Sequence, residues 1–243
     1  KVSKQKFVVI SDANGTGKST FLKSINSMLD RSKKWINLVD MKPHFDKFND
    51  IEFKNNQLDF SEFFVKEILQ LKCPLEVAVF NNLYKYQKVI ILFNNVEEMS
   101  QEGLENFTTF IKTFGSLQVW FSTSWENKEK LEAELNVVAY SLKPFTESEQ
   151  ISFIMNLWAT SSLDEGKLRC NATQLIRKIP KQGLSSIGML LPIRIMAEVY
   201  SRHKSSIDEC NTLFNVFKTY IEKTIWENFD RKLRGDVFEI LQI

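Results

Sequence analysis

Short apolar runs alternate with amphipathic stretches through the first 142 residues of the chain. The runs are continuous and rich in β-branched and aromatic side chains, which is typical of parallel strands buried on both faces. We predict strands at residues 7–10, 35–39, 89–93 and 119–121, and a last strand at 137–142.

Between these runs, apolar residues recur with the spacing of helices. Helices are predicted up to about residue 30, over 63–71 and 75–84, over 104–114, and around Leu131 and Leu135. Residues 40–60 are polar, contain Pro43 and predict a loop or an insertion. Strands that alternate with helices indicate a parallel sheet with right-handed crossovers. Ligands of such sheets bind at the carboxyl ends of the strands.

After Pro144 the strand pattern stops and only helical spacing follows. Four segments have this spacing, at residues 148–158, 172–179, 192–200 and 213–229. We therefore predict an α/β domain over residues 1–145, followed by a helical extension.

A glycine-bearing loop joins the first strand to the first helix, in the sequence VVISDANGTGKSTFL. A loop in this context binds phosphate: glycines adopt positive φ, so that backbone N–H groups and the helix dipole face the anion. Lys18 would reach the β- and γ-phosphates, and the Ser19 hydroxyl would bind Mg²⁺. The predicted nucleotide contacts are Ala13, Asn14, Gly15, Thr16, Gly17, Lys18, Ser19 and Thr20.

The loop departs from the pattern G-x-x-x-x-G-K-[ST], because Asp12 stands at the first glycine position. A carboxylate at the mouth of a phosphate site is unfavourable unless it points away or caps the helix. The alternative is a loop that only starts a helix and binds nothing.

An acidic stretch, NNVEE, follows the strand at 89–93. In a nucleotide hydrolase, a carboxylate at this place holds Mg²⁺ through water, and another acid orients the attacking water. Asn94 could hold the metal through water but brings no charge. Glu97 could belong to the metal shell, and either Glu97 or Glu98 could be the catalytic base. The alternative is an exposed acidic helix start.

Ser122 and Thr123 end the strand at 119–121, where they could contact a γ-phosphate or the attacking water. Strand termination by hydroxyl residues is the simpler interpretation of these two residues. His44 and His203 have no metal-ligand or catalytic neighbour at useful spacing, and we predict surface or hydrogen-bonded histidines.

The overall composition excludes some classes of function. The 243 residues include 32 Lys and Arg against 30 Asp and Glu, without a dense basic block, so nothing indicates nucleic acid. The apolar runs are far shorter than the ~20 residues that span a membrane. Three scattered cysteines, Cys73, Cys170 and Cys210, predict buried free thiols in a reducing cytoplasm. Because the chain begins with Lys, we expect a piece of a longer protein.

Taken in order, these stretches resemble the NACHT domain of the STAND class of P-loop NTPases, most of all in arthropod proteins. The loop VVISDANGTGKSTFL is similar to the family's Walker A motif, and KVIILFNNVEEMS is similar to its extended Walker B motif. The stretch QVWFSTSWENKEKLEAEL resembles the sensor strand, and MLLPIRIMAEVY resembles the segment whose proline lies against the adenine.

The resemblance implies a P-loop NTPase parallel sheet flanked by helices, a helical subdomain over residues 146–205, and the beginning of a winged-helix subdomain over 206–243. It implies that ATP or ADP binds with Mg²⁺, with Pro192 against the base. It also implies a cytoplasmic regulatory module of a signalling or innate-immune-like protein. Self-association or protein partners would act through flanking domains.

This chain departs from the family at the catalytic positions. Asn94 replaces the metal-associated aspartate, Asn95 replaces a glycine, and Trp125 stands where an arginine is common. We therefore expect a nucleotide-controlled module with weak or no hydrolysis. Two alternatives stay open: a slow Mg²⁺-dependent ATPase, and a nucleotide-free pseudo-NTPase that acts as an interaction scaffold.

Overall fold

A computed structural model describes residues 5–49, 60–159, 164–178, 190–202 and 213–222. The chain divides into two compact units, residues 1–14 with 18–142, and residues 15–17 with 143–243. We call them the α/β unit and the helical unit and describe each separately. Most of the predicted winged-helix segment, 206–243, lies outside the described residues.

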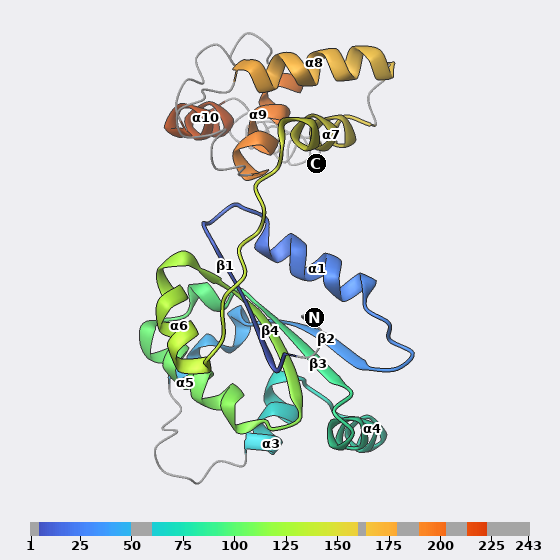
Figure 1. Cartoon of the computed structure of the whole chain (residues 1–243), viewed down its shortest axis with the longest axis vertical. Helices are drawn as coiled ribbons and strands as arrows, with labels where there is room; N and C mark the ends of the chain where they lie inside the picture. The colour runs from blue at the N-terminus through green and yellow to red at the C-terminus, as the bar shows by residue number, and fades with distance from the viewer. Residues whose placement is uncertain (1–4, 50–59, 160–163, 179–189, 203–212, 223–243) are drawn as a thin grey trace, which may run out of the picture. The chain divides into compact units, whose positions relative to one another are not determined.

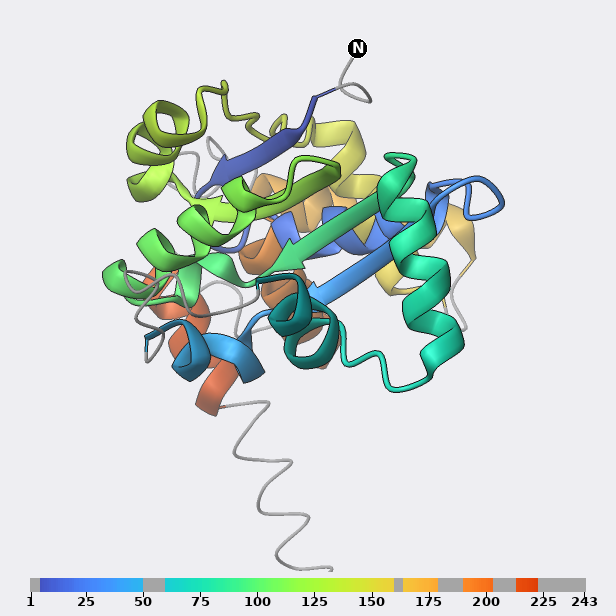
Figure 2. The same cartoon turned by 90° about the horizontal axis from the view of Figure 1, so that it is seen from below.

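Four parallel strands form the sheet of the α/β unit, in the order β1-β4-β3-β2 (Figure 2). They are β1 (Phe7–Asp12), β2 (Trp35–Asp40), β3 (Val89–Asn94) and β4 (Leu117–Ser124). Each of the four contains one of the predicted runs and extends beyond it by one to five residues. The register aligns the carboxyl ends, because Asp12 lies opposite Ser124 and Asp40 lies opposite Asn94.

The predicted strand at 137–142 is not a full strand. It pairs with β1 through one parallel bridge, between Ile10 and Tyr140. The Tyr140 N–H donates to the Val9 carbonyl at 2.8 Å, and the Ser11 N–H donates to the Tyr140 carbonyl at 2.8 Å. The prediction was wrong because an apolar run is not enough for a strand, which also needs a continuous ladder of backbone hydrogen bonds. Within this run, Val138 and Tyr140 are exposed.

Helix α1 (Lys18–Met28) covers one face of the sheet, and α5 (Gln101–Thr113) and α6 (Lys128–Leu135) cover the other (Figure 1). Side chains alternate between the faces along each strand. The fully buried Leu22 of α1 therefore packs in one cluster with the even-numbered strand residues Val8, Ile10, Ile36, Ile90, Leu92 and Trp120.

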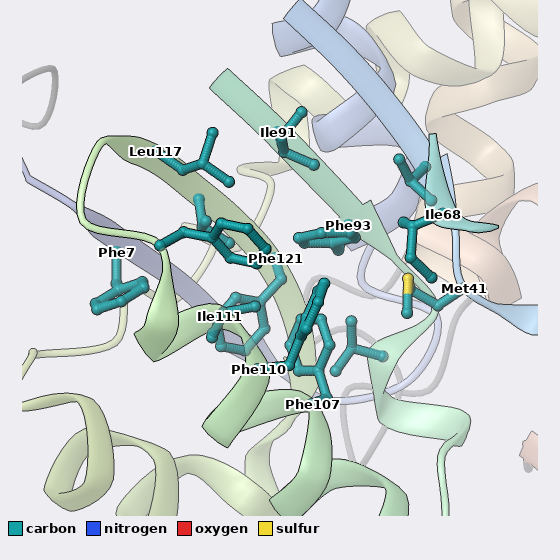
Figure 3. Close-up of a cluster of buried hydrophobic side chains, with 14 of the residues drawn as sticks. Phe7, Met41, Ile68, Ile91, Phe93, Phe107, Phe110, Ile111, Leu117 and Phe121 are labelled. Carbon is teal, nitrogen blue, oxygen red and sulfur yellow. The ribbon is translucent and has the colours of Figure 1, made fainter. Parts of the chain in front are cut away.

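The odd-numbered strand residues face an aromatic core (Figure 3). Phe107 of α5 has no exposed surface, and its ring centroid lies 5.2 Å from that of Phe93 and 5.5 Å from that of Phe121, both edge-on. The helices α3 (Phe60–Phe63) and α4 (Pro74–Lys85) and the π-helical turn η4 (Phe64–Ile68) contribute to the same core. Much of the chain's phenylalanine content is thus used to fill this side of the sheet.

Residues 42–49 are helical, which corrects part of the loop predicted over 40–60. They form η2 (Lys42–His44) and α2 (Phe45–Asn49), and the fully buried Phe48 anchors them in the aromatic core. His44 is also buried, and its Nδ1 has no hydrogen-bond partner, so the prediction of a surface or hydrogen-bonded histidine was wrong here. His203 lies outside the described residues.

The helical unit contains α7 (Glu147–Leu157), α8 (Glu165–Lys178), α9 (Leu190–Arg202) and α10 (Leu213–Tyr220). Its core includes the fully buried Ile154 and Leu175, with the Trp158 ring stacked on Tyr200. Thr146 and Glu149 form a reciprocal capping box at the start of α7, which fixes where this helix begins.

Two observations bear on the remaining predictions. Cys73 and Cys170 are exposed, so the prediction of buried thiols was wrong for both, and Cys210 lies outside the described residues. Among the described helices, none combines the length and the apolar character needed to cross a membrane.

Candidate functional site

Strand alternation brings a set of polar residues to one edge of the sheet. Ile10, Leu92 and Trp120 pack on the α1 side. Two residues further along their strands come Asp12, Asn94 and Ser122, at the carboxyl ends and on the same face. The candidate site is therefore the edge at which β1 ends and α1 begins.

The loop between β1 and α1 has the backbone geometry that the sequence predicted. Gly15 and Gly17 have φ values of 83° and 102°, which side-chain-bearing residues rarely adopt. Among the other predicted contacts in the loop, Thr16 is buried, Ser19 is half-buried and Asn14 is exposed.

Lys18, the first residue of α1, is only 4% exposed. Its ammonium donates hydrogen bonds to the backbone carbonyls of Asp12 and Ala13, both at 3.0 Å. A carboxylate oxygen of Glu97 lies 3.8 Å from the same nitrogen. A buried ammonium is costly unless it is paired, and these three oxygens supply the pairing.

The two predicted acidic residues have different surroundings. They lie in the short turn η5 (Val96–Glu98), which follows β3. Glu97 faces Lys18 and also accepts a hydrogen bond from the Ser122 hydroxyl at 3.3 Å. Glu98 is about half exposed and forms an ion pair with Lys42 at 2.9 Å. The structure therefore brings Glu97, and not Glu98, to the loop lysine.

Asn94 ends β3 and is 7% exposed, and its side-chain oxygen has no hydrogen-bond partner. Orphaned buried acceptors are uncommon in folded proteins, so an unpaired oxygen here fits a water or an ion at this edge. Among the described residues no group of three or more His, Cys, Asp and Glu could hold a metal by itself. Mg²⁺ commonly takes one or two protein ligands beside phosphate oxygens and waters, so the residues present fit that ion.

Asn95 stands where the resembled family has glycine, and its φ of 63° lies in the left-handed region. Asparagine tolerates this region better than most residues. Its side-chain amide donates to Asp40 at 2.8 Å, and the Met41 N–H donates to the Asn94 carbonyl at 3.0 Å. Burial raises the pKa of Asp40, but hydrogen bonds from Asn95 and from the Lys42 backbone outweigh it and hold that pKa below its ordinary value.

Asp12 accepts a hydrogen bond on each of its carboxylate oxygens. One carboxylate oxygen accepts from the Ala13 N–H at 2.8 Å, and the other accepts from the Leu142 N–H at 3.0 Å. Asp12 is the last residue of β1, and its φ is not positive, so its backbone does not require glycine. The role of Leu142 could not be predicted, because the two residues are 130 positions apart.

The two predicted sensor residues, Ser122 and Thr123, lie on opposite faces of the sheet. Ser122 lies with Glu97, whereas Thr123 belongs to the opposite face by strand alternation and is fully buried, with its hydroxyl unpaired. Trp125 begins the turn η6 (Trp125–Asn127) and is 65% exposed. Pro192 lies in the first turn of α9, in the helical unit, and its contact with a base stays a prediction.

Comparisons with known proteins bear on the fold alone. No family model and no curated protein matches the sequence. A chain in the Escherichia coli MS115-1 HORMA:CdnC:Trip13 complex is similar in structure, with a TM-score of 0.50 and 11% identity over 90% of this chain and 74% of that one. Caenorhabditis elegans PCH-2 gives a TM-score of 0.46 at 12% identity, over 89% of this chain and 60% of that one. A Thermotoga maritima RuvB mutant gives a TM-score of 0.46 at 14% identity, over 98% of this chain and 70% of that one.

The first of these likenesses, together with the sheet order, defines the fold. The chain has the fold of the P-loop NTPases, with a parallel sheet flanked by helices. The finer resemblance to NACHT domains stays a prediction.

Proposed function

We propose that this chain is a nucleotide-binding regulatory module that binds ATP or ADP with Mg²⁺ and hydrolyses ATP weakly or not at all. The observation that supports it most is the buried Lys18 ammonium, held between loop carbonyls and Glu97 at the carboxyl edge of a parallel sheet. Such an ammonium is desolvated and positioned before any ligand arrives, which favours tight binding of a phosphate.

In this proposal the loop residues 13–20 surround the phosphates, and the N-terminus of α1 contributes its dipole. Lys18 contacts the β- and γ-phosphates. The Ser19 hydroxyl, Asn94 through a water, and Glu97 hold Mg²⁺, which supplies charge neutralisation at the phosphates when bound. Ser122 orients Glu97 through their hydrogen bond.

Weak hydrolysis follows from two substitutions. Asn94 offers the metal an amide oxygen in place of a carboxylate, and Trp125 provides no cation at the sensor strand. Each loss removes charge stabilisation from the transition state, and together they account for several kcal/mol in enzymes of this kind. Binding needs neither charge, so nucleotide state can bias conformation or self-association without rapid turnover. The NACHT-type role in signalling belongs to this proposal.

Calorimetric titration with ATP and with ADP, with and without Mg²⁺, tests the proposal. We expect binding by the wild type and a loss of roughly 10- to 100-fold or more in Lys18→Ala, because a charged hydrogen-bond donor to phosphate is removed. Lys23→Ala is the matched control, since Lys23 is exposed on the same helix. Equal affinities in Lys18→Ala and the wild type would refute the phosphate site. No binding by any of the three proteins would favour the nucleotide-free scaffold.

The position of Glu97 supports a second candidate, a slow Mg²⁺-dependent ATPase. Glu97 lies beside Lys18 and accepts a hydrogen bond from Ser122, an arrangement that could orient an attacking water. Turnover of ATP should then fall at least tenfold in Glu97→Gln and stay within twofold in Glu98→Gln. Turnover that survives Glu97→Gln unchanged would exclude this role for the residue.

A further inference from the structure

Asp12 connects two parts of the α/β unit that are far apart in sequence. Its Oδ1 accepts from the Ala13 N–H, the first backbone donor of the phosphate loop. Its Oδ2 accepts from the Leu142 N–H. Its own carbonyl accepts from the Lys18 ammonium at 3.0 Å. One residue thus contacts the loop, the loop lysine and the end of the α/β unit.

Leu142 is the residue at which the α/β unit ends, since the helical unit resumes at residue 143. The segment 140–142 follows β1 toward the loop. Tyr140 pairs with β1 through its backbone, and the Ser141 hydroxyl donates to the Ser11 carbonyl at 3.2 Å. The Asp12 carboxylate provides the next contact along this path, at Leu142.

Glycine at position 12 could not make this hydrogen bond, because it has no side chain to accept from Leu142. Charge-assisted hydrogen bonds are about twice as strong as neutral ones, and Asp12 makes two of them to backbone N–H groups. These two hydrogen bonds offset the unfavourable electrostatics of a carboxylate beside the loop. The aspartate therefore joins two segments of the chain that glycine at this position would leave unconnected.

We propose that Asp12 is a positioning residue that ties residues 140–142 to the phosphate loop, so that nucleotide in the loop controls how firmly this segment is held. The control by nucleotide rests on the proposed function. A bound phosphate orders the loop and accepts a hydrogen bond from the Lys18 ammonium, which also donates to the Asp12 carbonyl. When the loop is ordered at Asp12, the hydrogen bond between Asp12 and Leu142 opens less often. By linkage, an intact hydrogen bond at Leu142 favours the ordered loop.

Hydrogen–deuterium exchange at Leu142 measures the contact directly, because its N–H is the donor. We expect exchange roughly tenfold faster or more in nucleotide-free Asp12→Gly than in the wild type. Asp12→Asn should be intermediate, since its one carbonyl oxygen cannot replace both carboxylate oxygens. The matched control is Asp30→Gly, which removes another aspartate that accepts from a backbone N–H, that of Ser32 at 2.9 Å. It should leave Leu142 unchanged.

Adding ATP completes the test. In the wild type, ATP should slow exchange at Leu142 roughly threefold or more, and in Asp12→Gly it should have no effect there. Exchange at Ile91, in the centre of the sheet, shows whether each variant is folded. Unchanged Leu142 exchange in both Asp12 variants would overturn the proposal, even if ATP binds. Faster exchange in Asp12→Gly without ATP binding to any protein would keep the contact but overturn its control by nucleotide, together with the proposed function.

Discussion

Removing the charge of Glu97, which forms an ion pair with Lys18, should have opposite effects on protein stability and on nucleotide affinity. In Glu97→Gln the carboxylate becomes a neutral amide of the same shape, and Lys18 keeps its two carbonyl partners. The side chains are 12% and 4% exposed, so the lost attraction is only partly screened by solvent. We expect the nucleotide-free protein to be less stable and ATP without Mg²⁺ to bind more tightly.

The distance sets the magnitude. Two unit charges 3.8 Å apart attract by about 4 kcal/mol at an effective dielectric constant of about 20. Desolvation of both groups opposes this attraction, so the free energy of unfolding should fall by roughly 1–3 kcal/mol. The same carboxylate opposes an incoming phosphate, and its removal should tighten Mg²⁺-free ATP binding by roughly three- to tenfold.

Urea unfolding and calorimetric titration measure the two effects. Glu98→Gln is the matched control one residue away, because its pair with Lys42 is about half exposed and should contribute no more than about 1 kcal/mol. A Glu97→Gln protein with wild-type stability and wild-type affinity would refute the argument. A Glu98→Gln protein that loses as much stability as Glu97→Gln would refute it too.

Two further predictions concern the fold. Burial lowers the pKa of His44, and the nearby charge of Lys47 lowers it further. As the pH falls below about 6.5, His44 therefore binds a proton more readily in the unfolded chain than in the folded one. Stability should therefore fall as the pH is lowered through about 6.5 in the wild type, and fall less in His44→Gln, as followed by urea unfolding. Phe107→Ala should lower the free energy of unfolding by about 3–5 kcal/mol, because the ring is fully buried among other aromatic rings.

Each of these two has its own check. An identical pH dependence in His44→Gln and the wild type would show that His44 titrates normally. For the core, Phe114→Ala is the comparison, since Phe114 is 6% exposed at the margin of the same cluster. Phe107→Ala should be the more destabilised of the two in denaturant unfolding, and the reverse order would contradict the described packing.

The sequence by itself determined the strands, most of the helices and the backbone conformation of the glycine-bearing loop. Continuous apolar runs mark strands buried on both faces, and Gly15 and Gly17 mark a backbone that other residues rarely adopt. These features are local, since each depends on residues within a few positions of one another. For the same reason the segment at 137–142 was overpredicted, because its apolar pattern says nothing of how few backbone bonds it makes.

Only the tertiary structure decided how the candidate residues are used. The sequence left Glu97 and Glu98 as equal candidates, and the fold turns one toward Lys18 and the other toward Lys42. It left Asp12 as an unexplained charge, and the fold provides Leu142 as its partner. Such choices depend on contacts between residues tens of positions apart or more, and they are fixed when parallel strands align their carboxyl ends at one edge.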